Sequence, residues 1–455
     1  MLKRKRLAFA VVSLLLMGLL LSAAACGGDS EEATEDTGGG DETTTTEAEA
    51  STDGDAEEQA AEPITLGVAT ALGSIEGADS ERAAKLAVEE INAAGGVDVG
   101  GESRPFEIVS IDTREHEPGT PTNDALLSVE KLITEQEPAA IAVGAFRSEV
   151  LLAEMDLISK YKVPYFTTIA MTPEFETKIS ENPEKYKYMF RTCLNAQGLV
   201  GGLAQVMGFL QEEYGFSKVY FVHQDVLWAS GTVKGLSGVI SEQGWEVVGT
   251  DAYPTGASDF SSSLNKIKAQ GAEVVVPIFD MPQSGILLKQ ADSMQVQSLF
   301  AGFIGPAAPG TAWDTFEGGV DGLVNFIFEA GPLPLQSIPK TVDFNDAYAE
   351  KYGEETQAKL SGHGPGPSYD TVYLIKDAIE RTGTLEPDAL VEAIEQTSMD
   401  GVIGHIGFGE NHQVVYGTDH TKEAVSVAFQ WVDGERVPVF PAGVAEGEIQ
   451  LPEGM

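Results

Sequence analysis

The chain has 455 residues, with 28 Lys and Arg against 71 Asp and Glu, so its formal net charge at pH 7 is −43. This acid excess argues against nucleic acid and anionic lipid as partners, because both would repel it. The only two cysteines are Cys26 and Cys193, which are too few for a disulfide framework.

The N-terminus carries an export signal. Lys and Arg occupy residues 3–6, an apolar run covers 7–21, and small residues at 22–25 stand directly before Cys26. This predicts a lipoprotein signal peptide over 1–25, because the small residues resemble a bacterial lipobox, although Ala23 stands where leucine is usual. The alternative is an uncleaved anchor helix, which the apolar run is long enough to form. Both interpretations hold the chain at a membrane, with its bulk outside the cytoplasm.

An acidic segment follows the cysteine. Residues 27–63 contain 14 Asp or Glu, no Lys or Arg, and otherwise mostly Gly, Ala, Ser and Thr. Such a composition cannot bury a core, so residues 26–63 are predicted to be a disordered tether. A flexible chain of this length has a root-mean-square reach of about 35 Å.

From Ile64 onward, short apolar runs alternate with amphipathic stretches, which predicts an α/β fold with parallel sheets covered on both faces. The first helix is expected to be capped by Asp79 or Ser80, and "GHGPGP" (362–367) is expected to be a flexible loop before a helix at 369. Two series of elements predict two Rossmann-like lobes. The expected strands are 64–71, 105–112, 139–145, 163–170, 218–223, 246–251, 272–279 and 298–304, and the expected helices are 79–96, 122–136, 148–161, 199–213, 231–243, 259–270 and 283–294.

Several stretches together resemble a known family: "AAKLAVEEINAAGGV" (83–97), "YPTGASDFSSSLNKIKAQGAEVVV" (253–276) and "YDTVYLIKDAIE" (369–380). They are similar to the type I periplasmic binding proteins of the branched-chain amino acid (Leu/Ile/Val) group, which are solute receptors of ABC importers. The resemblance implies two lobes joined by a three-strand hinge. The expected lobes are 64–190 plus 330–410 and 191–329 plus 411–455, with hinge crossings near 191–193, near 325–329 and after Gly409.

The segment "AVGAFRSEVLL" (142–152) is the first candidate for solute binding. A predicted strand ends at Ala145 and a helix begins at Ser148, so the serine hydroxyl and nearby amides could hold a carboxylate. A serine in this position commonly only caps its own helix. The resemblance favours ligand contact, and Phe146 and Arg147 are expected beside it.

Further site positions follow from strand ends and from the resemblance. Glu76 lies in the loop after the first strand, and Asp280 stands beside a strand-end phenylalanine; either could supply a charge for an ammonium group. Met171 and Ile304 stand where the family has a threonine and a glutamate. The remaining expected site residues are Thr167, Thr168 and Ile169 on the first lobe and the aromatic residues Trp228 and Phe279 on the second.

These observations predict a lipid-anchored solute-binding protein that delivers one small molecule to an ABC permease. No cofactor and no catalysis are implied, because the histidines are scattered without a zinc motif and no catalytic triad is evident. Leucine, isoleucine and valine are expected to bind weakly or not at all, and the solute is expected to be a small carboxylate or amide with an apolar or aromatic body. A tethered sensing receptor and an exported enzyme remain the alternatives.

Overall fold

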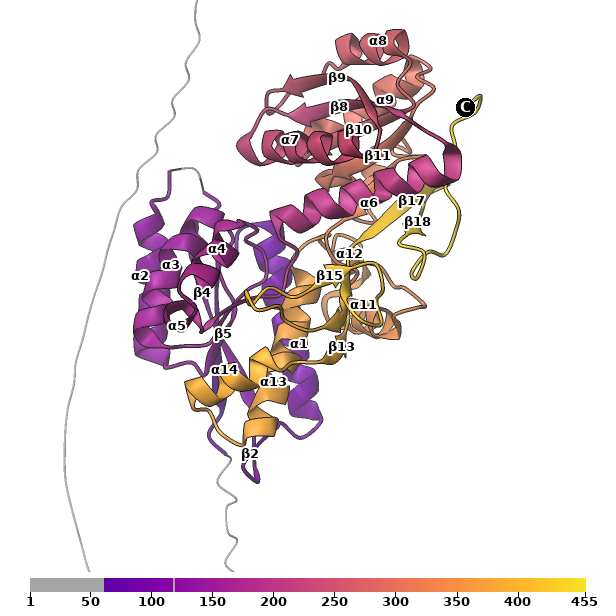
Figure 1. Cartoon of the computed structure of the whole chain (residues 1–455). Coiled ribbons are helices and arrows are strands. Elements are labelled where there is room, and N and C mark those ends of the chain that lie inside the picture. Colours follow the sequence, from indigo (N-terminus) through magenta and orange to yellow (C-terminus); the bar gives the residue numbers. More distant parts are fainter. Residues whose placement is uncertain (1–60, 118) are drawn as a thin grey trace, which may run out of the picture. The chain divides into compact units, whose positions relative to one another are not determined.

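The computed structural model describes residues 61–117 and 119–455, and Figure 1 shows their helices and strands. The predicted signal peptide, Cys26 and nearly all of the predicted tether lie outside these residues. In the described part, no helix combines the length and the apolar character needed to cross a membrane.

The first sheet is parallel throughout, with the strand order β4-β1-β5-β6-β7. Its strands are β1 (Ile64–Thr70), β4 (Phe106–Asp112), β5 (Ala140–Val143), β6 (Tyr165–Thr167) and β7 (Met189–Arg191). The helices between them are α1 (Ile75–Ala93), α2 (Thr122–Gln136), α3 (Ser148–Tyr161), α4 (Glu174–Glu181) and α5 (Pro183–Tyr186). The central strands read as continuous buried apolar runs, as expected for a sheet covered on both faces.

The second sheet has the order β18-β17-β12-β11-β10-β8-β9, and β17 and β18 join it antiparallel. Its strands are β8 (Lys218–Gln224), β9 (Glu246–Tyr253), β10 (Val274–Phe279), β11 (Leu299–Ile304), β12 (Val324–Ile327), β17 (Val427–Val432) and β18 (Glu435–Phe440). The connecting helices are α6 (Ala196–Tyr214), α7 (Leu227–Glu242), α8 (Ser261–Gln270), η1 (Pro282–Ser284), α9 (Gly285–Ser293), η2 (Gly305–Ala307) and α10 (Ala312–Thr315).

The parallel strands of both sheets are arranged in the same order: second, first, third, fourth, fifth along the chain. In such sheets the loops after the first and third strands diverge to opposite faces and open a crevice at the carboxyl ends. The first sheet has this switch point between β1 and β5, and the second has it between β8 and β10. The α/β fold with two Rossmann-like lobes is therefore confirmed.

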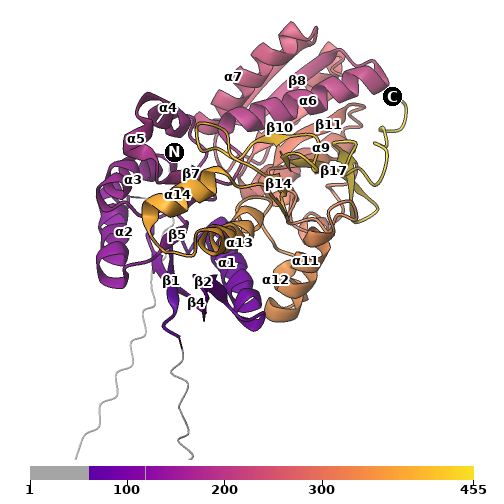
Figure 2. The same ribbon diagram turned by 60° about the horizontal axis from the view of Figure 1, so that its bottom comes forward.

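Elements from the C-terminal part of the chain complete the first lobe. Helix α13 (Pro365–Thr382) packs along α1, and Figures 1 and 2 both show the two helices side by side. The other elements are the hairpin β2 (Val97–Val99) and β3 (Glu102–Arg104), the helices α11 (Pro339–Tyr352), α12 (Glu354–Gln357) and α14 (Pro387–Glu395), and the small sheet of β13 (Met399–Gly401), β14 (Gly404–Ile406), β15 (Tyr416–Gly417) and β16 (Ala424–Val425).

Buried apolar side chains form a cluster around the first sheet and further clusters on the two faces of the second. The first cluster contains Val414 and Ala424, whereas Ala330 and Ile338 belong to the second lobe's core. The expected lobe bounds placed Val414 and Ala424 on the second lobe, and Ala330 and Ile338 on the first. The lobe boundaries stay a prediction. The core clusters to which these residues belong favour second and third hinge crossings later in the chain than expected.

The expected start of the first helix is wrong. Helix α1 begins at Ile75, and the hydroxyl of Ser74 caps it by accepting the amide of Gly77 at 2.9 Å. Asp79 lies inside the helix, where its carboxylate accepts the Ser361 amide at 3.0 Å and the Tyr348 hydroxyl at 3.1 Å. Its oxygens bind groups from distant segments, so this aspartate serves tertiary packing and not the helix end.

The "GHGPGP" stretch is also not a free loop. Gly364 has a φ of 102° and is the N-cap of α13, and residues 365–367 form the first turn of that helix. Proline is tolerated there because the first-turn amides have no partner within the helix.

Candidate functional site

On the first lobe, the switch point brings together the beginnings of α1 and α3. Glu76 lies in the first turn of α1 and is partly buried, and Ser148 is the first residue of α3. The N-cap of α3 is Arg147, and no side chain among the described residues caps this helix. The interpretation of Ser148 as a helix cap is therefore wrong, and its hydroxyl does not serve that role.

A buried carboxylate binds the backbone amides just before α3. Glu115, which is 3 % exposed, accepts the amides of Phe146 at 3.0 Å and Arg147 at 2.9 Å, and the hydroxyl of Thr113 at 2.8 Å. Burial raises the pKa of Glu115, although these donors oppose the rise. A ligand group at Ser148 would thus find the two preceding amides already bound. Sequence reasoning missed Glu115 because its partners lie about thirty residues away.

Of the expected residues at the end of β6, Thr167 is the last residue of the strand, and the others lie in the following loop, residues 168–171, which we call the β6 loop. Thr167 is fully buried, and its hydroxyl has no hydrogen-bond partner among the described residues. Thr168 accepts the hydroxyl of Ser368 at 2.9 Å, and the carbonyl of Ile169 lies 2.7 Å from His363 Nε2. Met171 is partly buried against the core of the second lobe.

On the second lobe, Trp228 in the first turn of α7 contacts Asp280, the residue that follows β10. The indole Nε1–H donates to Asp280 Oδ2 at 2.9 Å, and this carboxylate is otherwise exposed. The indole meets the ring of Phe303 edge to face at a centroid distance of 5.9 Å, and Phe303 stacks on Phe328 at 4.7 Å. Trp228 and Phe303 keep part of their surface exposed. The arrangement offers an aromatic wall with an anionic end.

Two expected site residues of the second lobe are fully buried. The structure buries Phe279 and Ile304 completely in one core cluster, where Phe279 meets Phe260 edge to face at 5.9 Å. Side chains alternate along a strand, so Phe279 points into the core, and it is the next residue, Asp280, that is exposed. Neither buried side chain presents surface to a solute.

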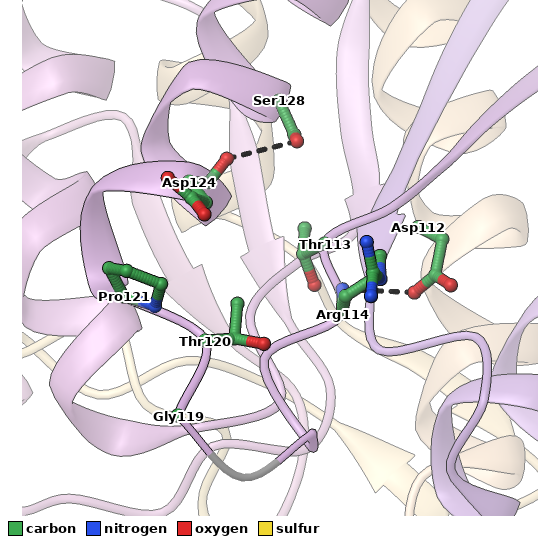
Figure 3. A pocket seen from close by; sticks show the side chains of 8 residues that line it. All are labelled: Asp112, Thr113, Arg114, Gly119, Thr120, Pro121, Asp124 and Ser128. Atoms are coloured by element: carbon green, nitrogen blue, oxygen red, sulfur yellow. Dashed lines mark hydrogen bonds between the residues drawn. The ribbon is translucent and has the colours of Figure 1, made fainter.

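Other features of the described residues do not form part of this site. Two hollows, of about 380 Å³ and 580 Å³, are lined by other residues. Figure 3 shows the smaller one, bordered by the loop after β4 and the start of α2, where the Arg114 amide donates to Asp112 Oδ1 at 3.0 Å. No group of three or more His, Cys, Asp or Glu in residues 61–117 and 119–455 could hold a metal ion. Cys193 is a buried free thiol, and burial raises its pKa.

Comparison with known proteins identifies the family. The model of the periplasmic binding protein family matches residues 63–444. The Leu/Ile/Val-binding protein homolog 7 of Brucella suis is 26 % identical over 388 residues, covering 83 % of this chain and 90 % of the relative. Homolog 8 of Brucella melitensis is 25 % identical, covering 82 % of this chain and 89 % of the relative.

Solved structures share the fold. A putative branched-chain amino acid ABC transporter protein from Silicibacter pomeroyi superposes with a TM-score of 0.75 at 18 % identity, covering 87 % of this chain and all of its own. The branched-chain amino acid substrate binding protein of Streptococcus pneumoniae, in complex with isoleucine, gives a TM-score of 0.63 at 20 % identity, covering 86 % and 100 %. Because the family match spans nearly the whole described body, the chain belongs to the periplasmic binding protein family, and it has the two-lobed type I fold of these solved structures.

Proposed function

We propose that this chain is the substrate-binding lipoprotein of an ABC importer, anchored outside the cytoplasm through Cys26. It binds one amino acid-like solute, or a small carboxylate or amide, between its lobes and presents the closed form to the permease. Hinge closure around a ligand is the general mode of periplasmic binding proteins. The family membership supports the extracytoplasmic location and the binding role.

The observation that carries the proposal is the chemistry at the two switch points. Glu76 and Ser148 lie at one, and Trp228 and Asp280 lie at the other. Crevices at the carboxyl ends of parallel strands are where α/β sheets bind small ligands, and an apolar wall with a few placed polar groups is the usual lining. Both lobes thus supply polar groups for the same solute.

The solute is expected to have an apolar or aromatic body. The partly exposed faces of Trp228 and Phe303 favour such a body, because burying them against it removes apolar surface from water. An ammonium group needs a carboxylate partner, and Ile304 stands where the family resemblance places one. Glu76 and Asp280 are the available substitutes, although Asp280 already accepts the Trp228 indole. We therefore expect leucine, isoleucine and valine to bind weakly or not at all.

A thermal-shift screen of the purified chain tests this function, with amino acids, carboxylates, amides and aromatic acids as candidates. A solute at a hundredfold excess over its Kd stabilises the folded state by about 2.7 kcal/mol. The expected result is stabilisation by one class of small solute, and its loss in Trp228→Ala. A matched control is Trp313→Ala, because Trp313 packs against Trp431 in the second lobe, away from both switch points. Absence of any stabilising solute across these classes would contradict the proposal.

A further inference from the structure

His363 links separate segments of the fold through both nitrogens of its ring. Nδ1 lies 3.0 Å from Glu329 Oε1, and Nε2 lies 2.7 Å from the carbonyl oxygen of Ile169. The His363 side chain is 13 % exposed and that of Glu329 is fully buried. The ring also meets Phe328 edge to face at 4.9 Å. This histidine is therefore held on every side by fixed partners.

Both partners of the ring are acceptors. A carbonyl oxygen has no proton to give, and the two oxygens of Glu329 also accept the amides of Leu194 at 3.1 Å and Gly364 at 3.3 Å. A neutral imidazole has only one N–H, so one of its nitrogens would direct a lone pair at an oxygen. The geometry therefore favours the imidazolium form, in which both nitrogens donate.

The surroundings of the ring favour its positive charge. Burial alone would lower the pKa of His363, but the charge and hydrogen bond of Glu329, the Ile169 carbonyl and the charge of Glu76 on α1 together raise it above its usual value. Cys193 and Tyr416 also face Glu329, and burial raises the pKa of both, which keeps them neutral at ordinary pH.

The charged groups beyond these direct neighbours, Asp79 and Arg191, each have a partner of opposite charge. Asp79 on α1 binds Ser361, whose hydroxyl contacts the backbone of His363, and its charge is balanced by Arg82 at 2.8 Å. Arg191, beside Cys193, is paired with Glu176. Glu329 and Glu76 are therefore the charges that set the protonation of His363.

The imidazolium of His363 links the β6 loop to Glu329 after β12 and to the start of α13. Glu329 follows β12, where the chain leaves the second sheet, and Gly364 begins α13 on the first lobe. Ile169 belongs to the β6 loop, which the Ser368–Thr168 hydrogen bond also joins to α13. Loss of the ring proton would remove one of these ties and leave an oxygen facing a lone pair, which is an unfavourable contact.

We propose that protonated His363 is a positioning residue for solute binding, because it fixes the β6 loop between α13 and the carboxylate that follows β12. This inference rests on the proposed function, since it assigns a role within the same site. A group whose pKa is raised in the ordered state stabilises that state fully at pH values below its free pKa, about 6.5. This stabilisation is lost as the pH rises through the raised pKa. Solute affinity should therefore hold at acidic pH and fall at alkaline pH, by at most about tenfold per pH unit for one proton.

The first test needs no solute. Hydrogen–deuterium exchange of the β6 loop is measured in the full chain at pH 6 and pH 9 and corrected for intrinsic exchange. We expect stronger protection at pH 6 in the wild type, and weak protection at both values in His363→Gln, because one amide nitrogen cannot bridge both acceptors. His405→Gln is the matched control, since His405 also pairs with a carboxylate, Asp400 at 2.8 Å, but on the β13–β14 hairpin. Equal protection in wild type and His363→Gln would overturn the proposal.

The second test measures solute affinity by calorimetry between pH 5.5 and pH 9. The wild type should weaken above the His363 pKa, His363→Gln should be weak and flat, and Glu329→Gln should shift the decline to lower pH. A profile that is the same in wild type and His363→Gln would refute the positioning role. Failure of every solute to bind at any pH would instead contradict the proposed function, while the exchange experiment would still decide the role of His363.

Discussion

Arg191 is a fully buried cation at the end of β7, where the chain leaves the first sheet. Its guanidinium pairs with Glu176, donates to Gln413 Oε1 at 2.5 Å and to the Thr172 carbonyl at 2.9 Å, and lies 4.7 Å from the Phe175 ring centroid. Substitution Arg191→Met keeps much of the volume but leaves the Glu176 carboxylate and these acceptors without their donor. Removing one partner of a buried ion pair costs about 3–5 kcal/mol, so we expect a loss of that size in unfolding free energy.

Urea unfolding followed by tryptophan fluorescence measures this loss. Lys160→Met is the control, because the Lys160–Glu130 pair is exposed and such pairs contribute about 0–1 kcal/mol. If Arg191→Met costs no more than the control, the reasoning that Arg191 is a desolvated structural cation is wrong. If Arg191→Met loses much stability but Arg191→Lys retains all of it, the positive charge matters and the planar guanidinium geometry does not.

Three further outcomes are expected. Trp228→Ala should weaken solute binding at least tenfold in calorimetry, whereas Trp228→Phe, which keeps an aromatic face but loses the bond to Asp280, should weaken it less; equal loss in both would point to the hydrogen bond. Small-angle scattering should show contraction on adding a tight solute, and an unchanged radius of gyration would remove the clamp mechanism. Cys26→Ser should release the protein from membranes after fractionation, and a variant still bound at unprocessed mass would favour the uncleaved helix.

Local patterns in the sequence were sufficient for the regular elements. The bounds of α2 and α3 were predicted to the residue, because each is an amphipathic run between clear strand ends. The start of α1 was placed a turn too late, since Asp79 has the chemistry of a cap but binds Tyr348 and Ser361 from distant segments. Local propensity has no information about such partners.

The candidate site stays a prediction: the sequence located residues at strand ends, but it did not show which distant segments they contact. Trp228 and Asp280 follow neighbouring strands of one sheet, and their hydrogen bond was not predicted from the sequence. Phe279 and Ile304 were misplaced because a strand-end position does not say which face a side chain takes. Glu115 and His363 were missed because each is defined by hydrogen bonds to backbone groups brought together only by the complete fold.

The packing of α13 on α1 determines how much of the chain must exist before the first lobe can fold. Helix α1 follows the first strand, yet the helix that covers it ends at Thr382, and the same core is completed by Ala424. Closing so long a loop costs conformational entropy before any contact repays it, so this pairing should form slowly. A nascent or truncated chain that stops before α13 leaves the apolar face of α1 uncovered. The first lobe thus cannot be produced by a simple C-terminal deletion, and a separate first lobe requires the late segment to be joined to the early one by a designed linker.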